Sequence, residues 1–138
     1  MQTPAPTVTV SKKMLWTGRI MSALSVLLLL FSAVMKLANL PGLASGFAHF
    51  GIPISQAFGL GVLEFACAVV YMIPRTSFLG AILMTGYLGG ATATNVRVGD
   101  PCYIPVILGV LVWGGLFLRE PRLRALIPLK SQTPSLKD

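Results

Sequence analysis

Glu64 has the strongest case for chemistry, because it is the only charged residue in the apolar stretch from 55 to 73. A carboxyl group inside a bilayer is costly, so it normally faces the interior of a helix bundle and has a polar partner there. Mostly small neighbours share its helical face, at spacings of three, four and seven residues: Gly61, Cys67, Ala68 and Tyr71. We therefore expect ligand binding or proton handling at Glu64. The alternative is a neutral carboxyl that only ties helices together through hydrogen bonds.

Two further sets of residues fall at helical spacing in the neighbouring apolar stretches. The first stripe consists of Ser22, Ser25, Ser32 and Lys36. The second stripe consists of Tyr87, Ala91, Thr94 and Asn95. Both stripes should line the interior that Glu64 faces. Antiparallel helices would place Tyr87 at a depth similar to that of Glu64, so we predict a hydrogen bond between the phenol and the carboxyl group.

A second group of polar residues is predicted to gather at the outer mouth of this interior: Lys36, Asn95, Arg97 and Asp100. Lys36 lies near a helix end. Its ammonium group could equally well pair with Glu64 or extend to the lipid headgroups. His49 is the only histidine and lies among Phe residues in the outer loop. One interpretation is that His49 and these Phe residues anchor the loop at the membrane interface. The other is that His49 binds a quinone headgroup or transfers protons.

Motifs for self-contained catalysis are absent from the sequence. It has no nucleotide-binding loop, metal-ligand cluster or nucleophilic triad, so we expect no metal site and a non-catalytic subunit. Cys67 lies deep inside one apolar run and Cys102 at the edge of another, which predicts two free thiols. The glycines of the apolar runs are expected to be helix contact positions.

Composition excludes an ordinary soluble domain. Of the 138 residues, 54% are hydrophobic and only 11% charged, too few polar residues to cover a water-soluble globule of this size. Four apolar runs, at about 14–37, 55–73, 77–96 and 101–118, each approach the roughly 20 residues that span a bilayer as a helix. A cleaved secretory signal is the alternative for the first run. Turn residues separate the runs, and the loop at 39–54 suits a short interfacial helix.

The basic residues predict the orientation. Nine of them fall on one side of four spans: Lys12, Lys13, Arg19, Arg75, Arg119, Arg122, Arg124, Lys130 and Lys137. Only Lys36 and Arg97 fall on the other side. Because basic loops remain cytoplasmic, both ends should be cytoplasmic. The same residues flank apolar runs, so we expect contact with membrane lipid and no nucleic acid partner.

The predicted fold is thus all-α: an integral membrane four-helix bundle over residues 14–119, with a short interfacial helix between its first two spans. Residues 1–11 are expected to be a mobile tail, and residues 120–138 a basic cytoplasmic tail.

Several segments together resemble the DoxX-like family of membrane proteins, over about 18–119. They are SerAlaValMetLysLeu at 32–37, GlyPheAlaHisPheGlyIlePro at 46–53, GlyValLeuGlu at 61–64, IleProArgThr at 73–76 and LeuGlyAlaIleLeu at 79–83. The resemblance implies a four-helix membrane fold in which Lys36 and Glu64 are family polar positions. Many members have a Thr-His pair near the end of the third helix, where this chain has Thr94 and Asn95, and Ala33 replaces a common Gly.

The founding members of this family look like the small subunit of a membrane thiosulfate:quinone oxidoreductase. By this resemblance we expect an accessory or quinone-interacting subunit of a membrane redox complex. Such a subunit would have no intrinsic cofactor beyond a bound quinone. Its partner would be a redox enzyme or a second copy of the chain, and its place the bacterial inner membrane. The alternatives are a small proton-coupled transporter and a structural or chaperone-like membrane subunit.

Overall fold

The computed structural model describes residues 11–126, and this part of the chain is helical without any strand. In chain order the elements are α1 (Lys12–Leu37), α2 (Leu43–His49), the 3-10 turn η1 (Ile54–Gln56), α3 (Ala57–Met72), α4 (Ser77–Val98), α5 (Tyr103–Arg119) and α6 (Pro121–Leu126). The all-α prediction is confirmed for these residues. The predicted tail residues 1–10 and 127–138 lie outside the described part.

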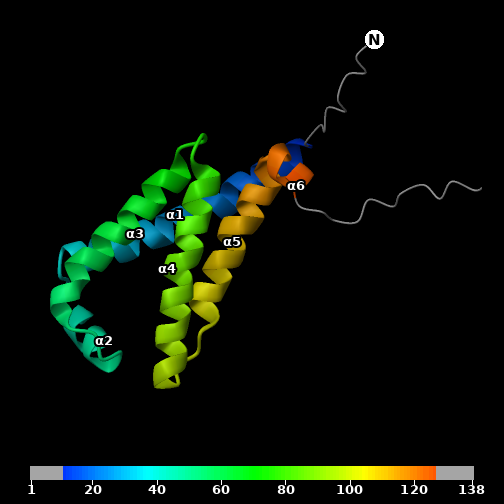
Figure 1. Ribbon diagram of the computed structural model, residues 1–138. Helices are drawn as coiled ribbons and strands as arrows, with labels where there is room; N and C mark the ends of the chain where they lie inside the picture. Colours follow the sequence, from blue (N-terminus) through cyan, green and yellow to red (C-terminus); the bar gives the residue numbers. More distant parts are fainter. Residues whose placement is uncertain (1–10, 127–138) are drawn as a thin grey trace, which may run out of the picture.

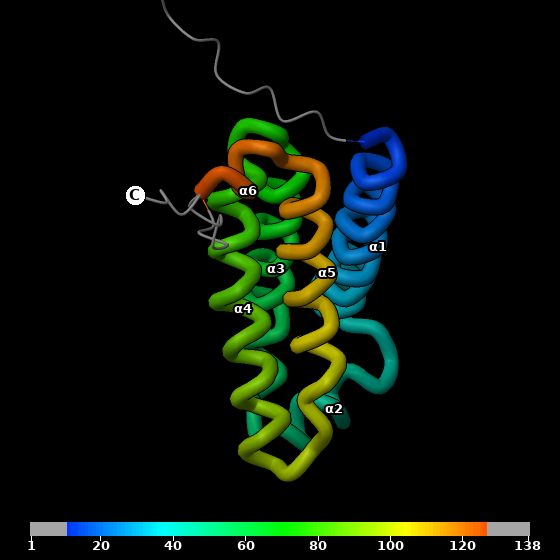
Figure 2. The backbone as a smooth tube through the Cα atoms, turned by 90° about the vertical axis from the view of Figure 1, so that its right-hand side faces the viewer, coloured from blue at the N-terminus to red at the C-terminus, as the bar shows by residue number. Residues whose placement is uncertain are grey.

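The four long helices form a closed ring in which each contacts two neighbours. α1 packs against α3 and α5, and α4 packs against the same two helices from the other side. The chain direction alternates, so the start of α1, the α3–α4 turn and α6 lie at one end, while α2 and the α4–α5 turn lie at the other (Figures 1 and 2). We call these the α6 end and the α2 end. Their packing differs, and this difference positions the site.

The α6 end is tightly packed because glycines let the helices touch. A Cβ added at Gly115 of α5 would lie 2.4 Å from Ser22 Oγ of α1, and one at Gly80 of α4 would lie 2.4 Å from the Tyr71 backbone of α3. Tyr71 is fully buried there, and its hydroxyl donates to the Val112 carbonyl at 2.8 Å and bonds Ser22 Oγ at 2.9 Å. This hydroxyl therefore joins three of the four long helices.

The glycine prediction is wrong for part of the set. A Cβ added at any of four glycines would meet no heavy atom of a neighbouring element within 4 Å: Gly59, Gly86, Gly89 and Gly90. Gly89 and Gly90 lie on the half of α4 nearer the α2 end, where α1 and α3 diverge from α4 and α5, and Gly86 lies just before the middle of α4 (Figure 1). Small residues thus serve close packing at one end and leave open space at the other.

The turns at the ends of the helices follow local backbone chemistry. The Ser11 hydroxyl accepts the Met14 N–H at 3.3 Å and caps the start of α1. Gly99 adopts a left-handed conformation with φ 81° and ends α4, which lets the chain turn tightly into α5. The expected short helix of the outer loop is α2, while α6 forms inside the segment expected to be a basic tail.

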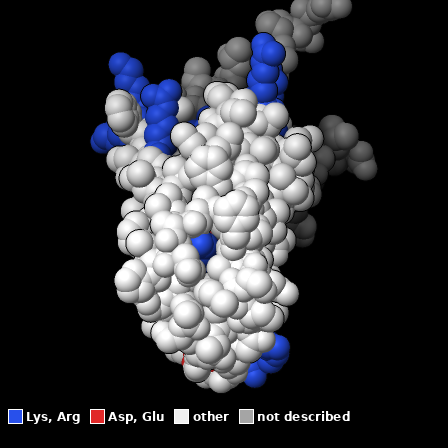
Figure 3. Space-filling view, turned by 90° about the vertical axis from the view of Figure 1, so that its left-hand side faces the viewer, with Lys and Arg blue, Asp and Glu red and all other residues white. Residues whose placement is uncertain are grey.

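Many large apolar side chains are exposed on the outside of the ring, among them Trp16, Phe31 and Ile107. Two helical segments, α1 and Ile54–Met72, are long and apolar enough to cross a membrane, and α5 is apolar but shorter. Only 28% and 33% of the residues in the most apolar windows of the first two segments are buried within the protein. Figure 3 shows an almost uncharged surface with basic side chains near its two ends and one basic group in its middle.

Candidate ligand-binding site

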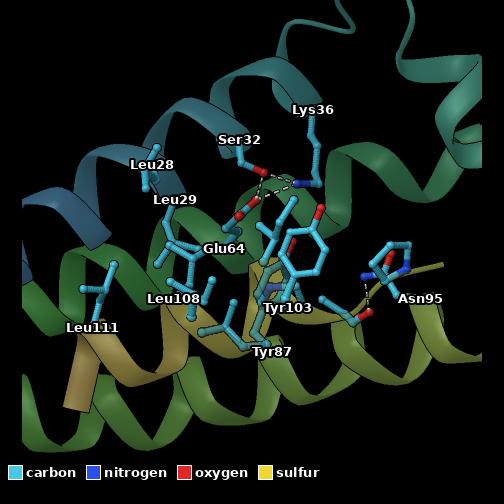
Figure 4. Close-up of a pocket in the computed structure, with 16 residues that line it drawn as sticks. Leu28, Leu29, Ser32, Lys36, Glu64, Tyr87, Asn95, Tyr103, Leu108 and Leu111 are labelled. Atoms are coloured by element: carbon cyan, nitrogen blue, oxygen red, sulfur yellow. Dashed lines mark hydrogen bonds and ion pairs between the residues drawn. The ribbon is translucent and has the colours of Figure 1, made fainter. Parts of the chain in front are cut away.

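A cavity of about 500 Å³ opens inside the ring toward the α2 end, and we call it the first cavity. Sixteen residues line it, mostly aliphatic ones such as Leu29, Leu108 and Leu111, and all four long helices contribute. Its polar wall consists of Ser32, Lys36, Glu64, Tyr87, Asn95 and Tyr103 (Figure 4). An apolar hollow with a few convergent polar groups is the usual form of a small-molecule site.

An ion pair forms the centre of this polar wall. Lys36 Nζ lies 2.8 Å from Glu64 Oε2 and 2.6 Å from Ser32 Oγ, and Ser32 Oγ donates to the same carboxylate oxygen at 3.2 Å. The Glu64 side chain is 3% exposed and that of Lys36 is 16% exposed. Of the two interpretations of Lys36, the structure favours pairing with Glu64, because the ammonium group turns inward to the carboxylate and away from the surface (Figure 4).

Hydrogen-bonding capacity is left over at this ion pair. An ammonium group carries three protons, of which Glu64 and Ser32 take two. Lys36 and Ser32 both contact Oε2 of the carboxylate, which leaves Oε1 free of them. Tyr87 lines the same cavity within reach of the Glu64 carboxylate, which supports the predicted hydrogen bond between the two side chains. The site thus offers both donors and an acceptor to a molecule in the cavity.

A second cavity of about 460 Å³ lies beneath α2, between α3 and α4. Its walls are mainly apolar or glycine: Phe47, Phe50, Ile52, Leu60, Leu63, Gly86, Gly90 and Ala91. Its polar residues are Lys36, Tyr87, Thr94 and Asn95. Four residues line both cavities, namely Lys36, Tyr87, Ala91 and Asn95. The two cavities therefore adjoin at these residues, which we call the junction.

The polar stripe of α4 faces this junction. Thr94 Oγ1 donates to the Gly90 carbonyl at 2.8 Å, and Asn95 Nδ2 donates to the Ala91 carbonyl at 2.9 Å. Hydroxyl and amide groups inside a helix often turn back to the carbonyl four residues earlier in this way. Thr94 therefore adds little free hydrogen-bonding capacity to the second cavity.

Two other predicted site residues have a different place. His49 Nε2 lies 2.7 Å from Asp100 Oδ2, and Arg97 Nη2 donates to the Phe50 carbonyl. Both contacts join the α2 segment to the end of α4 and the turn after it. Of the eight predicted residues, six line a cavity: Ser32, Lys36, Glu64, Tyr87, Thr94 and Asn95. His49 and Arg97 hold α2 over the second cavity and line neither one.

Several cavity residues carried no clear sequence signal. Tyr103 opens α5 beside the first cavity, and the only clue was an aromatic residue at the start of an apolar run, two positions after Pro101. Phe47 and Phe50 were seen only as interface anchors, although both line the second cavity. Cys67 is buried and Cys102 partly buried, and both are free, as predicted.

Most of the chain matches a known protein family. Residues 20–115 match the model of the DoxX-like family. No curated protein and no solved structure matches the chain. The matched range contains every residue that lines the two cavities. Since this range is well over half of the sequence, the chain belongs to the DoxX-like family of membrane proteins.

Proposed function

We propose that the protein is a multi-pass membrane protein whose four long helices all span the bilayer, with both ends in the cytoplasm. The outward-facing apolar side chains support this, because a core helix of a soluble protein would bury most of them. The basic residues at the α6 end support a cytoplasmic location of that end. As an expectation from the family, the membrane is the bacterial inner membrane.

Thiol labelling in intact cells tests this topology. In a variant in which Cys67 and Cys102 are serines, we expect Gly99→Cys to react with a membrane-impermeant maleimide and Lys13→Cys to react only after lysis. Reaction of both positions in intact cells, or of neither, would contradict the proposed orientation. The two sites lie at opposite ends of the ring, so each is the control for the other.

We further propose that the first cavity binds a quinone and that the protein is an accessory subunit of a membrane redox complex. The observation that carries this is the Lys36–Glu64 pair, buried in the wall of an otherwise apolar cavity. A quinone carbonyl would accept a hydrogen bond from Lys36 or Tyr87, and the hydroxyl of a quinol would donate to Glu64. The aliphatic walls would accommodate the rest of such a ligand.

The small contribution of a buried ion pair to stability supports a functional reason for the Lys36–Glu64 pair. Desolvation of two charges offsets most of their attraction, so apolar residues of similar volume often stabilise a protein as well or better. An ion pair inside a membrane is therefore a site by default. Its free donor and acceptor positions face a cavity large enough for a small molecule, within the usual range of roughly 300–1,000 Å³.

Native mass spectrometry on protein extracted in a mild detergent tests the quinone proposal. We expect a co-purifying quinone in the wild type and its loss in the double variant Lys36→Met, Glu64→Leu, which removes both charges together. Ser25→Ala is the matched control, because Ser25 is buried on the same helix and, within residues 11–126, its hydroxyl bonds only the Met21 carbonyl. A wild type that neither carries quinone nor binds added ubiquinone would contradict the proposal. Proton-coupled uptake lost in Glu64→Gln would then favour a transporter, and its absence a structural role.

A further inference from the structure

We infer that the second cavity is the binding site of the apolar tail of the ligand whose headgroup lies in the first cavity. This inference rests on the proposed quinone site and deepens it, because it specifies an amphipathic ligand with a long isoprenoid chain. The chain would pass the junction at Lys36, Tyr87, Ala91 and Asn95 and continue beneath α2.

The first argument is the difference in polar chemistry between the cavities. Glu64 and Ser32 line the first cavity and not the second, and Lys36 keeps one ammonium proton beyond those bonded to these two residues. Thr94, by contrast, lines the second cavity and not the first, and its hydroxyl already donates to the Gly90 carbonyl of its own helix. A ring with carbonyl or hydroxyl groups therefore fits the first cavity, and a hydrocarbon chain fits the second.

The second argument is the shape of the α4 wall. Gly86 and Gly90 lie one helical turn apart and line the second cavity, and a Cβ added at either would meet only open space. Glycine in the middle of a helix costs up to about 1 kcal/mol relative to alanine, and no helix packs against these two closely enough to require it. A smooth surface of two glycines leaves room for a chain between α4 and the phenyl rings of Phe47 and Phe50.

The third argument is that the two cavities share part of their walls. Lys36 and Tyr87 belong to the walls of both, so a headgroup bonded to them lies at the entrance to the second cavity. The aliphatic part of the first cavity, around Leu28 and Leu111, is the competing place for the chain. The experiment below separates these two places.

Filling the second cavity from its glycine wall gives a direct test. Gly90→Leu would place an isobutyl group in the second cavity, whereas Gly89→Leu adds the same group to the adjacent position, which has open space and lines neither cavity. Each full-length variant is mixed with equal amounts of two ubiquinone homologues, one with a single isoprene unit and one with several. The ratio of bound long-tail to short-tail homologue is then measured by native mass spectrometry.

We expect the wild type and Gly89→Leu to bind the long-tail homologue preferentially, and Gly90→Leu to lose that preference by about tenfold. A tenfold change in binding needs the loss of apolar contacts to only about two methylene groups of the tail. Binding of the short-tail homologue should stay unchanged, which also shows that the variant is folded. Gly86→Leu is the second variant and should behave as Gly90→Leu does.

Two outcomes would overturn the inference, and they differ in what else they overturn. Equal long-tail preference in Gly90→Leu, Gly86→Leu and Gly89→Leu would place the chain outside the second cavity while the quinone site in the first cavity remains. Failure of the wild type to bind either homologue would overturn the proposed function as well.

Discussion

Lys36 of α1 and Glu64 of α3 are joined by an ion pair of 2.8 Å between Nζ and Oε2, inside the wall of a cavity. Ser32 contacts both groups from one turn earlier on α1, so two helices share one small polar cluster. The cluster lies where the helix ring opens toward the α2 end, below the tight glycine contacts of the α6 end.

Removing one member of this pair should destabilise the protein far more than removing both. Glu64→Leu leaves the Lys36 ammonium group without its counter-charge, and Lys36→Met leaves the carboxylate without its own. Each single change should lower the free energy of unfolding by about 3 kcal/mol, whereas the double variant should be nearly neutral. Denaturant unfolding in detergent micelles measures all three. Additive losses in the double variant would mean that the two groups do not depend on each other.

Tyr71→Phe should loosen the α6 end by about 1–2 kcal/mol. The change removes one hydroxyl that bonds Ser22 of α1 and the Val112 carbonyl of α5, and it leaves the buried Val112 carbonyl without this donor. Thermal unfolding checks the loss. Tyr103→Phe is the control with the same atomic change, and it should have almost no effect on stability because Tyr103 is 59% exposed.

Alanine scanning of the α4 glycines should give opposite signs at two positions. A Cβ at Gly80 would lie 2.4 Å from the Tyr71 backbone, so Gly80→Ala must push α3 and α4 apart and should cost about 1–3 kcal/mol. Gly89→Ala meets open space and should stabilise the helix by up to about 1 kcal/mol. Thermal unfolding of the two variants compares them directly. A destabilised Gly89→Ala would show that this face is packed.

The contact between His49 and Asp100 should control the mobility of α2 rather than overall stability. Their side chains are 54% and 35% exposed, and exposed pairs contribute only about 0.2–1 kcal/mol. His49→Gln or Asp100→Asn should therefore raise hydrogen exchange of the amides in 43–49 by a few-fold at most. Exchange in α5 is the internal reference and should not change. An equal increase in both segments would indicate general loosening of the fold.

The sequence by itself determined which residues face inward on single helices. The face of Glu64 was predicted from spacing alone as Gly61, Cys67, Ala68 and Tyr71, and all four are buried in α3. The limits of the four long helices also followed from apolar runs and turn residues, to within about two residues. Helical periodicity and turn chemistry are local properties, so they can be read from a few neighbouring residues.

The sequence did not determine how these faces meet. It left Lys36 equally well explained by Glu64 and by the lipid headgroups, and only the crossing of α1 and α3 decided the partner. It treated all glycines of the apolar runs alike, although Gly80 touches a backbone and Gly90 borders a cavity. Contacts of this kind depend on distances between helices that are far apart in the chain. Those distances are fixed by packing of the whole ring, and only the tertiary structure decided them.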